Sequence, residues 1–515
     1  MKRPQPSKSL ALCIVLLVVH FLSSAQASAP ADTYIRSQRL GITFIGSPEH
    51  PADDARYQRA LELGAGWNRW PLYWNHVETQ PGVFDWTAAD RAVRDDIAHG
   101  LRTDAILLGM PEFRRDEGRI AGLNAPIYSD GTDTYREDKT LNPENYWADF
   151  VRRALERYRP GGALAQEMGW TAGEGIRVWE IWNEPDFALF WSGSISDYAR
   201  LLKVAYIVAH SIDPQAQIMF GGLIFNSEDG TNYLARVLAV LENDPLRAEN
   251  NWYMDIVAVH NYNYAWRSGW LVRWVRETLE AYGLTRPIWL NETGAPVWDD
   301  YPGPTWAQTP EERVLRVTQQ QQAWFLVQSA AYAWSEGADV IFYHQLYDDC
   351  GNQAPGTDFA PYDGENAGDA FGLFRNEAHA LCFSQHPQPG SARPAAHAFR
   401  LLAQVFANLP FRSVAMLDMP DGSTGVLFDL GTRTVRVLWN QTLTDIKVML
   451  PAQTAQAVLL VSDGRFVLGA ARQETRLVYE VNLPAAVVDD FPFLNIGDVV
   501  GIGGAPSILI EGTPP

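Results

Sequence analysis

Two glutamates, each near the end of a short apolar run, are the residues of this chain best suited to acid–base chemistry. The run VWEIWNEPD contains Glu184, and a second run, PIWLNETG, contains Glu292 108 residues later. Pro185 follows the first glutamate and ends a strand there, because proline has no N–H to donate to a strand ladder. Asn183 and Asn291 precede the two glutamates. We therefore expect two carboxylates at the ends of buried strands, where they can act as a general acid and a nucleophile.

The elements that must position these glutamates form a repeating strand–helix pattern. Eight short apolar runs predict strands at 40–45, 66–70, 104–108, 177–182, 217–220, 255–260, 288–291 and 339–344. Amphipathic stretches predict helices at 52–63, 87–99, 143–158, 196–211, 231–241, 269–282, 310–336 and 394–409. Eight such units predict an α/β fold of the (β/α)8 TIM barrel type, with the active site at the strand C-terminal ends. An open doubly wound sheet is the alternative, but no Gly-rich first turn supports it.

The chain after residue 410 has a different pattern. Strand-like runs at 425–429, 434–439, 447–450, 458–462 and 477–482 are separated by turn residues, and no helical period occurs. We predict a (β/α)8 barrel over 36–410 and a β-sandwich accessory domain over 411–515. The run 508–510 is either a last strand of the sandwich or a strand that returns to the barrel.

Residues at the strand C-terminal ends of a barrel converge on one pocket. Read in chain order, these ends supply Arg69, Asn183 with Glu184, His260 with Tyr262, Glu292, and His344 or Gln345. Two glutamates across a pocket can divide the roles of glycoside hydrolysis, and a separation of about 5 Å predicts retention of configuration. Glu180 is expected to be a structural partner within its strand. Trp74, Trp266 and Trp298 follow strands and are candidates for stacking on a sugar.

These motifs resemble clan A glycoside hydrolases, the (β/α)8 enzymes in which Glu after strand 4 is the acid/base and Glu after strand 7 the nucleophile. WEIWNEPD and WLNETG resemble those two positions, and families 39 and 5 are the most similar. GAGWNRWPLYWNHVETQPGVFDW resembles the strand-2 segment, in which Arg69 supports the nucleophile. VHNYNY resembles the strand-6 segment, in which Tyr262 bonds to the nucleophile, and FGLF and RPAAHAF resemble the segment before the last helix. The resemblance covers residues 36–410.

The start of the chain resembles an export signal. Three basic residues precede the apolar run 10–22, and Ala25-Gln26-Ala27 is a small-residue cleavage site, so residues 1–27 are predicted to be a signal peptide. Removing them changes the net charge from −20 to −23, which disfavours nucleic acid as a partner. No other stretch is long enough to span a membrane. We expect a secreted or periplasmic protein without membrane insertion.

Cysteines and acidic residues bear on possible crosslinks and metals. Cys350 and Cys382 remain after processing, and they either form a disulfide or stay free. No zinc-like Cys/His spacing, Gly-rich phosphate loop or Asp-rich calcium loop occurs, so chemistry without a cofactor or metal is expected. The pairs Asp299-Asp300 and Asp348-Asp349 are expected to be a solvated rim.

The sequence therefore predicts a secreted retaining glycoside hydrolase that cleaves β-glycosidic bonds of oligo- or polysaccharides. Glu184 is the predicted acid/base and Glu292 the predicted nucleophile. The predicted substrate-binding residues are Arg69, Asn183, His260, Tyr262, His344 and Trp298. A transglycosylase and a non-catalytic carbohydrate-binding protein on the same barrel are the alternatives.

Overall fold

The computed structural model describes residues 35–171, 173–225, 232–262, 264–300, 316–350, 369–462, 464–487, 495–496 and 499–513. The predicted signal peptide, at residues 1–27, lies outside this part of the chain, and so does the predicted helical start at 310–315. The described residues form one compact unit.

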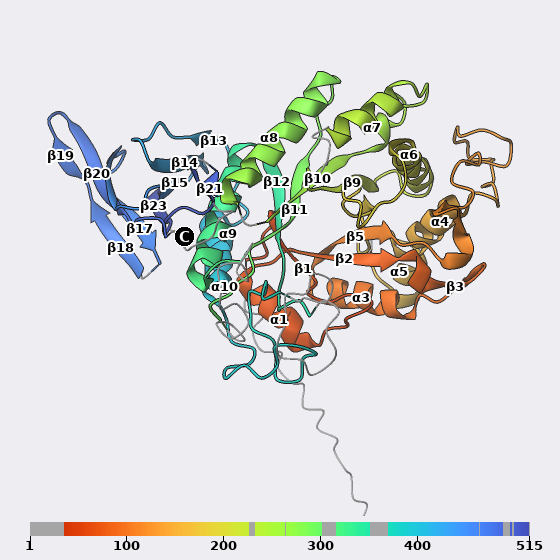
Figure 1. The fold of residues 1–515 in the computed structure, drawn as a ribbon, viewed down its shortest axis with the longest axis horizontal. Helices are drawn as coiled ribbons and strands as arrows, with labels where there is room; N and C mark the ends of the chain where they lie inside the picture. The colour runs from red at the N-terminus through yellow and green to blue at the C-terminus, as the bar shows by residue number, and fades with distance from the viewer. Residues whose placement is uncertain are drawn as a thin grey trace, which may run out of the picture. The chain divides into compact units, whose positions relative to one another are not determined.

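Eight parallel strands close into a barrel at the centre of this unit (Figure 1). The strands are β1 (Leu40–Thr43), β2 (Trp67–Tyr73), β5 (Arg102–Leu108), β8 (Val178–Ile181), β9 (Gln217–Leu223), β10 (Ile256–Tyr262), β11 (Ile288–Gly294) and β12 (Ala338–Tyr343). The first strand pairs with both β2 and the last strand, with Thr43 opposite Arg69 and Leu40 opposite Ile341. The predicted TIM barrel is thus confirmed, and the open sheet is excluded.

A helix follows each barrel strand and covers its outer side. The eight helices are α1 (Asp54–Leu63), α3 (Thr87–Ala98), α4 (Tyr146–Tyr158), α6 (Ile195–Ile212), α7 (Tyr233–Glu242), α8 (Ala265–Ala281), α9 (Gln319–Ser335) and α10 (Pro394–Phe406). The expected helix 310–336 is not helical at 316–318, because Thr318 and Gln321 form a capping box that begins α9 at Gln319.

Short elements interrupt several connections at both ends of the barrel. They are α2 (Trp74–Val77), β3 (Glu78–Gln80), β4 (Val83–Phe84), η1 (Glu112–Arg114), β6 (Arg115–Asp116), β7 (Arg119–Ile120), α5 (Ala163–Met168) and η2 (Asn251–Tyr253).

The barrel interior has an apolar layer beneath a polar one. Trp67 and Trp289 meet edge to face at 5.0 Å, and Phe342 packs beside both in a buried apolar cluster. Alternate residues of a strand point to the same side. Arg69 lies two positions after Trp67 on β2, and Asn291 lies two positions after Trp289 on β11. Both therefore point into the barrel, in the layer above the apolar one. The apolar layer supports a buried polar layer nearer the strand C-terminal ends.

Two antiparallel sheets make up the C-terminal part of the chain. Their strands are β13 (Ser413–Met416), β14 (Ser423–Asp429), β15 (Arg433–Asn440), β16 (Ile446–Pro451), β17 (Gln456–Val461), β18 (Gly464–Gly469), β19 (Ala471–Gln473), β20 (Arg476–Leu483) and β23 (Ser507–Gly512), with a separate short pair β21 (Asn495–Ile496) and β22 (Val499–Val500). The six-stranded sheet has the order β13-β14-β15-β23-β17-β18, and the three-stranded sheet has the order β16-β20-β19. Leu438 and Leu509 of the first sheet share a buried cluster with Val448 and Val481 of the second. This arrangement confirms the predicted β-sandwich, and it places residues 508–510 at the sandwich centre, not in the barrel.

Helix α9 joins the barrel to this sandwich. The Gln328 side chain donates to the carbonyls of Gly503 and Gly504 at 3.0 and 2.9 Å, and Tyr332 contacts Trp439 edge to face at 4.9 Å. Buried hydrogen bonds from a side-chain amide, such as these, fix the position of α9 against the sandwich. Among the described residues, no helix has both the length and the apolarity that a membrane crossing requires.

Candidate active site

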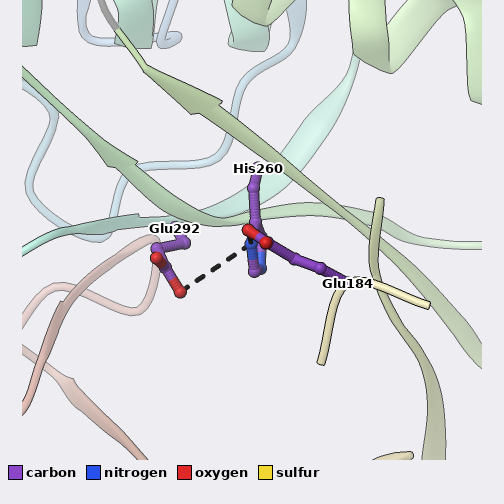
Figure 2. Close-up of side chains that lie close together, drawn as sticks. All are labelled: Glu184, His260 and Glu292. Carbon is purple, nitrogen blue, oxygen red and sulfur yellow. Dashed lines mark hydrogen bonds and ion pairs between the residues drawn. The ribbon is translucent and has the colours of Figure 1, made fainter. Parts of the chain in front are cut away.

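Three side chains, two on strands and one just after a strand, meet at the C-terminal mouth of the barrel. Glu184 follows β8, His260 lies on β10 and Glu292 lies on β11, and Figure 2 shows the three groups directed at one another. One carboxylate oxygen of each glutamate and one ring nitrogen of the histidine all lie within 4.8 Å of one another. The two glutamates that the sequence predicted as a catalytic pair therefore share one pocket.

Arg69 is the cationic centre of this pocket and is itself buried. Its Nη1 donates to Glu292 Oε2 at 2.6 Å, and its Nη2 donates to Asn183 Oδ1 at 2.9 Å. Its Nε donates to Glu180 Oε2 at 2.8 Å. Glu180 also accepts from the backbone N–H of Gly222 at 2.9 Å, so it is the buried structural partner that the sequence predicted. A guanidinium held on both sides cannot turn away from Glu292, because its planar fork is already occupied.

Glu292 is held by polar groups on both of its oxygens. The Tyr262 hydroxyl donates to Oε1, opposite the bond from Arg69. His344 Nδ1 lies 3.9 Å from the same Oε1 and 2.9 Å from the Thr43 hydroxyl. Two donors on a carboxylate favour its ionised form and fix its orientation.

Glu184 has a different environment. His260 Nδ1 lies 2.7 Å from Glu184 Oε1, which is a hydrogen-bond distance, and Glu184 as a whole is buried. The backbone at Trp182 and Glu184 has φ of 65° and 42°, a left-handed conformation that costs a non-glycine residue of the order of 1 kcal/mol. Strain at this position indicates that the surrounding structure holds the carboxyl group where it is.

Burial and charge shift the pKa values of the two glutamates in opposite directions. Burial raises the pKa of Glu184 above its ordinary 4.5, and the bond from His260 reduces that rise without cancelling it. Burial acts in the same direction on Glu292, but the positive charges of His260 and Arg69 outweigh it, so the pKa of Glu292 falls well below 4.5. One carboxyl group is thus disposed to keep its proton and the other to stay ionised. This is the division that separates an acid from a nucleophile.

The pKa of His260, which lies between the two glutamates, is shifted by opposing effects. Burial alone would lower the pKa of His260, but the negative charges of Glu292 and Glu184 raise it above 6.5. His260 therefore takes part in the proton balance of both carboxylates.

Two carboxylates and an imidazole within 4.8 Å are also a possible ligand set for a divalent cation. Glu292, however, already accepts from Arg69 at 2.6 Å and from Tyr262. A cation bound to Glu292 would lie about 4 Å from this fixed guanidinium. The two positive charges would then repel each other by several kcal/mol at the effective dielectric of a protein site. The arrangement fits proton transfer better than metal binding.

Most of the predicted site residues lie in this pocket. Arg69, Asn183, His260 and Tyr262 contact one another or the two glutamates, and His344 lies beside Glu292. Trp298 is half-buried in the loop after β11, where its backbone N–H donates to the Val317 carbonyl at 3.0 Å, and its role in binding stays a prediction.

One predicted stacking residue was wrong, and one aromatic residue of the site was missed. Trp74 is fully buried in α2 and its indole N–H donates to Glu78, so it cannot stack on a sugar. Phe371 was not predicted to take part. Its ring meets the rings of His344 and Tyr262 edge to face at 5.0 and 5.5 Å. Along the chain, Phe371 lies well after the end of β12 at Tyr343 and before α10. A search of strand ends therefore could not identify it.

No protein-family model and no curated protein matches the sequence. Solved structures do match. A family 39 glycoside hydrolase from the gut symbiont Bacteroides cellulosilyticus WH2 is similar over 93% of this chain and 81% of its own, with 16% identity and a TM-score of 0.56. AbfB, a family 51 α-L-arabinofuranosidase from Bifidobacterium longum, is similar over 93% of this chain and 96% of its own, with 12% identity and a TM-score of 0.54. A GH30 endoxylanase from Clostridium papyrosolvens C71 is similar over 93% and 97%, with 12% identity and a TM-score of 0.51.

These similarities concern the fold. This chain shares its overall architecture with these glycoside hydrolases of families 39, 51 and 30. At 12–16% identity they do not transfer a substrate or a residue role to this chain.

Proposed function

We propose that the protein is a retaining glycoside hydrolase that cleaves β-glycosidic bonds. The observation that carries this proposal is the pairing of Glu184 and Glu292, with carboxylate oxygens within 4.8 Å and pKa values shifted in opposite directions. Retaining enzymes have carboxyl groups about 5–5.5 Å apart, whereas inverting enzymes need about 6.5–9.5 Å to admit a water. The separation in this pocket supports the retaining mechanism.

In the first step, a Glu292 oxygen attacks the anomeric carbon and the bond to the leaving oxygen breaks. Glu184 gives its proton to that oxygen, so the leaving group departs as an alcohol and a glycosyl ester forms on Glu292. In the second step, Glu184 takes a proton from water while the water oxygen attacks the same carbon. The ester bond breaks, and Glu292 returns to its ionised form.

The neighbouring residues have roles that follow from their contacts. Arg69 and Tyr262 bond to Glu292 and stabilise its ionised form before attack and after release. Asn183 is oriented by Arg69 and precedes Glu184, which places its amide to bond a sugar hydroxyl near the reacting carbon. His260 holds the Glu184 carboxyl group in position.

The test is hydrolysis of a panel of aryl β-glycosides and of β-glucan, xylan and mannan by residues 28–515. Glu292→Ala is assayed in parallel. We expect hydrolysis of at least one substrate by the wild-type protein, reduced by 10⁴-fold or more in the variant, of the order seen when a nucleophile is removed. Full activity in Glu292→Ala contradicts the proposal. Products longer than the substrate would identify a transglycosylase with the same intermediate, and sugar binding without any turnover would identify a binding protein.

We also propose that the protein acts outside the cytoplasm. The basic start, apolar run and small-residue cleavage site of residues 1–27 support export. The disulfide between Cys350 and Cys382 also supports it, because such bonds persist in oxidising compartments. N-terminal sequencing of the exported protein is expected to begin at Ser28, and a retained Met1 would contradict this.

A further inference from the structure

The loop after Glu184 exposes apolar side chains to solvent. Leu189 is 76% exposed and Phe190 39%, and Leu189 is the most exposed large apolar residue of the described chain. Residues 187–196, FALFWSGSIS, contain no charged side chain, although the chain as a whole has a net charge of −20. Exposed apolar residues grouped beside a polar pocket mark a binding surface.

This loop is fixed to the proposed acid/base. The Phe187 N–H donates to the Glu184 carbonyl at 2.9 Å, and the Phe190 N–H donates back to the Phe187 carbonyl at 3.0 Å. The Trp182 indole N–H then donates to the Phe190 carbonyl at 2.7 Å. The turn therefore starts at Glu184 and returns over Trp182, the residue that directly follows β8. Leu189 and Phe190 lie at the barrel mouth on the Glu184 side.

The chemistry of the pocket determines what meets this loop. A sugar attacked by Glu292 lies between the two carboxylates, and the oxygen that Glu184 protonates belongs to the leaving group. The leaving group therefore extends from Glu184 away from Glu292, toward the loop that begins at Glu184. The Leu189 side chain has neither a hydrogen-bonding group nor a planar ring on which a sugar could stack. An alkyl or aryl leaving group, in contrast, would cover Leu189 and Phe190.

We propose that the loop 187–191 is an aglycone site and that the preferred substrates are glycosides of apolar alcohols, with an alkyl or aryl group on the leaving oxygen. This inference rests on the proposed glycosidase function and specifies its substrate class. One methylene group gained or lost in an apolar contact changes specificity by about 10- to 200-fold, and removal of the Leu189 or Phe190 side chain takes away more than one.

The experiment compares leaving groups on one sugar. Glucosyl, xylosyl and galactosyl β-fluorides, which have no aglycone, first identify the sugar that the full chain hydrolyses. The values of kcat/KM are then measured for its fluoride, its octyl β-glycoside and its β-linked disaccharide. Leu189→Ser and Phe190→Ser are compared with Val467→Ser, a matched control because Val467 is 70% exposed on β18 in the sandwich.

We expect the wild-type protein to prefer the octyl glycoside to the disaccharide by about tenfold or more. The ratio of octyl glycoside to fluoride kcat/KM should fall by about tenfold in each loop variant and stay unchanged in Val467→Ser. A preference for the disaccharide, or an unchanged ratio in both loop variants, overturns the aglycone site while hydrolysis of the fluoride sustains the glycosidase. Failure of the wild-type protein to hydrolyse any fluoride or glycoside overturns both.

Discussion

Arg69 Nη1 lies 2.6 Å from Glu292 Oε2, and this contact makes Arg69 the fixed countercharge of the proposed nucleophile. The guanidinium is buried and its other side is held by Glu180. Two carboxylates thus share one cation, and one of them is the nucleophile. Arg69 thus has two roles: it neutralises the buried Glu180 within the barrel, and it stabilises the ionised form of Glu292.

Because Glu180 shares the charge of Arg69, two isosteric substitutions near Arg69, Glu180→Gln and Asp104→Asn, should change the stability of the protein by different amounts. Glu180→Gln removes one of the charges that Arg69 balances, and breaking a buried ion pair of this kind costs about 3–5 kcal/mol of stability. Burial and the charge of Glu180 raise the pKa of Asp104 well above its ordinary 3.8, which favours the neutral form of this carboxyl group. Asp104→Asn should therefore change the free energy of unfolding at pH 7 by less than about 1 kcal/mol. Urea unfolding checks both values, and an equal loss in the two variants would contradict the assignment of charge.

The opposite pKa shifts predict a pH profile with two limbs. The pKa of Glu292 is lowered, so the nucleophile is lost only as pH falls well below 4.5. The pKa of Glu184 is raised by burial, so the acid is lost as pH rises through a value above 4.5. We expect kcat/KM on an unactivated glycoside to be bell-shaped, with its alkaline limb set by Glu184.

Glu184→Gln is the variant that checks the alkaline limb. With an activated 2,4-dinitrophenyl glycoside, whose leaving group needs no proton, the variant should retain its first step and lose the limb. A limb that persists unchanged in Glu184→Gln would assign it to another group.

Gly222 on β9, the strand beside that of His260, leaves the space that the imidazole occupies. A Cβ added to Gly222 would lie 1.9 Å from His260 Nε2, far closer than real contacts allow. Gly222→Ala should displace the imidazole from Glu184, lower kcat by about 10- to 100-fold and move the alkaline limb. Gly469→Ala is the matched control, because a Cβ there meets nothing within 4 Å. Wild-type kinetics and pH profile in Gly222→Ala would show that His260 does not position the acid.

The repulsion between Arg69 and a cation predicts that catalysis needs no metal. Dialysis against EDTA should leave kcat/KM within about twofold of its starting value, and added Zn²⁺ or Mn²⁺ should not raise it. Activity that disappears with EDTA and returns with one ion would place a cation on Glu184, His260 and Glu292.

Much of the site could be predicted because the barrel topology brings strand ends together. Glu184, His260 and Glu292 each end or follow an apolar run, so placing the strands was enough to place the three residues in one pocket. Contacts between loops do not follow from this rule. Phe371 reaches His344 from the connection between β12 and α10, whose described residues form no helix or strand, and no local pattern marks such a contact.

The expected solvated rim shows the same limit for charges. Asp300 and Asp348 are buried, and Arg393 donates to both of them, at 2.9 Å to Asp300 Oδ2 and 2.5 Å to Asp348 Oδ1. The prediction of a solvated position was wrong for these two aspartates, because their partner is 45 or more residues away along the chain. A buried charge becomes predictable only when its partner is known.

The most direct test of the account is identification of the residue that carries the glycosyl intermediate. The wild-type protein is incubated with the 2-deoxy-2-fluoro β-glycosyl fluoride of its sugar, which slows release of the ester, and is then digested and analysed by mass spectrometry. We predict one labelled peptide with the sugar on Glu292, and no label in Glu292→Gln. A label on Glu184 or on any other residue, or turnover to the inverted product without an adduct, would contradict the assignment of Glu292 as nucleophile.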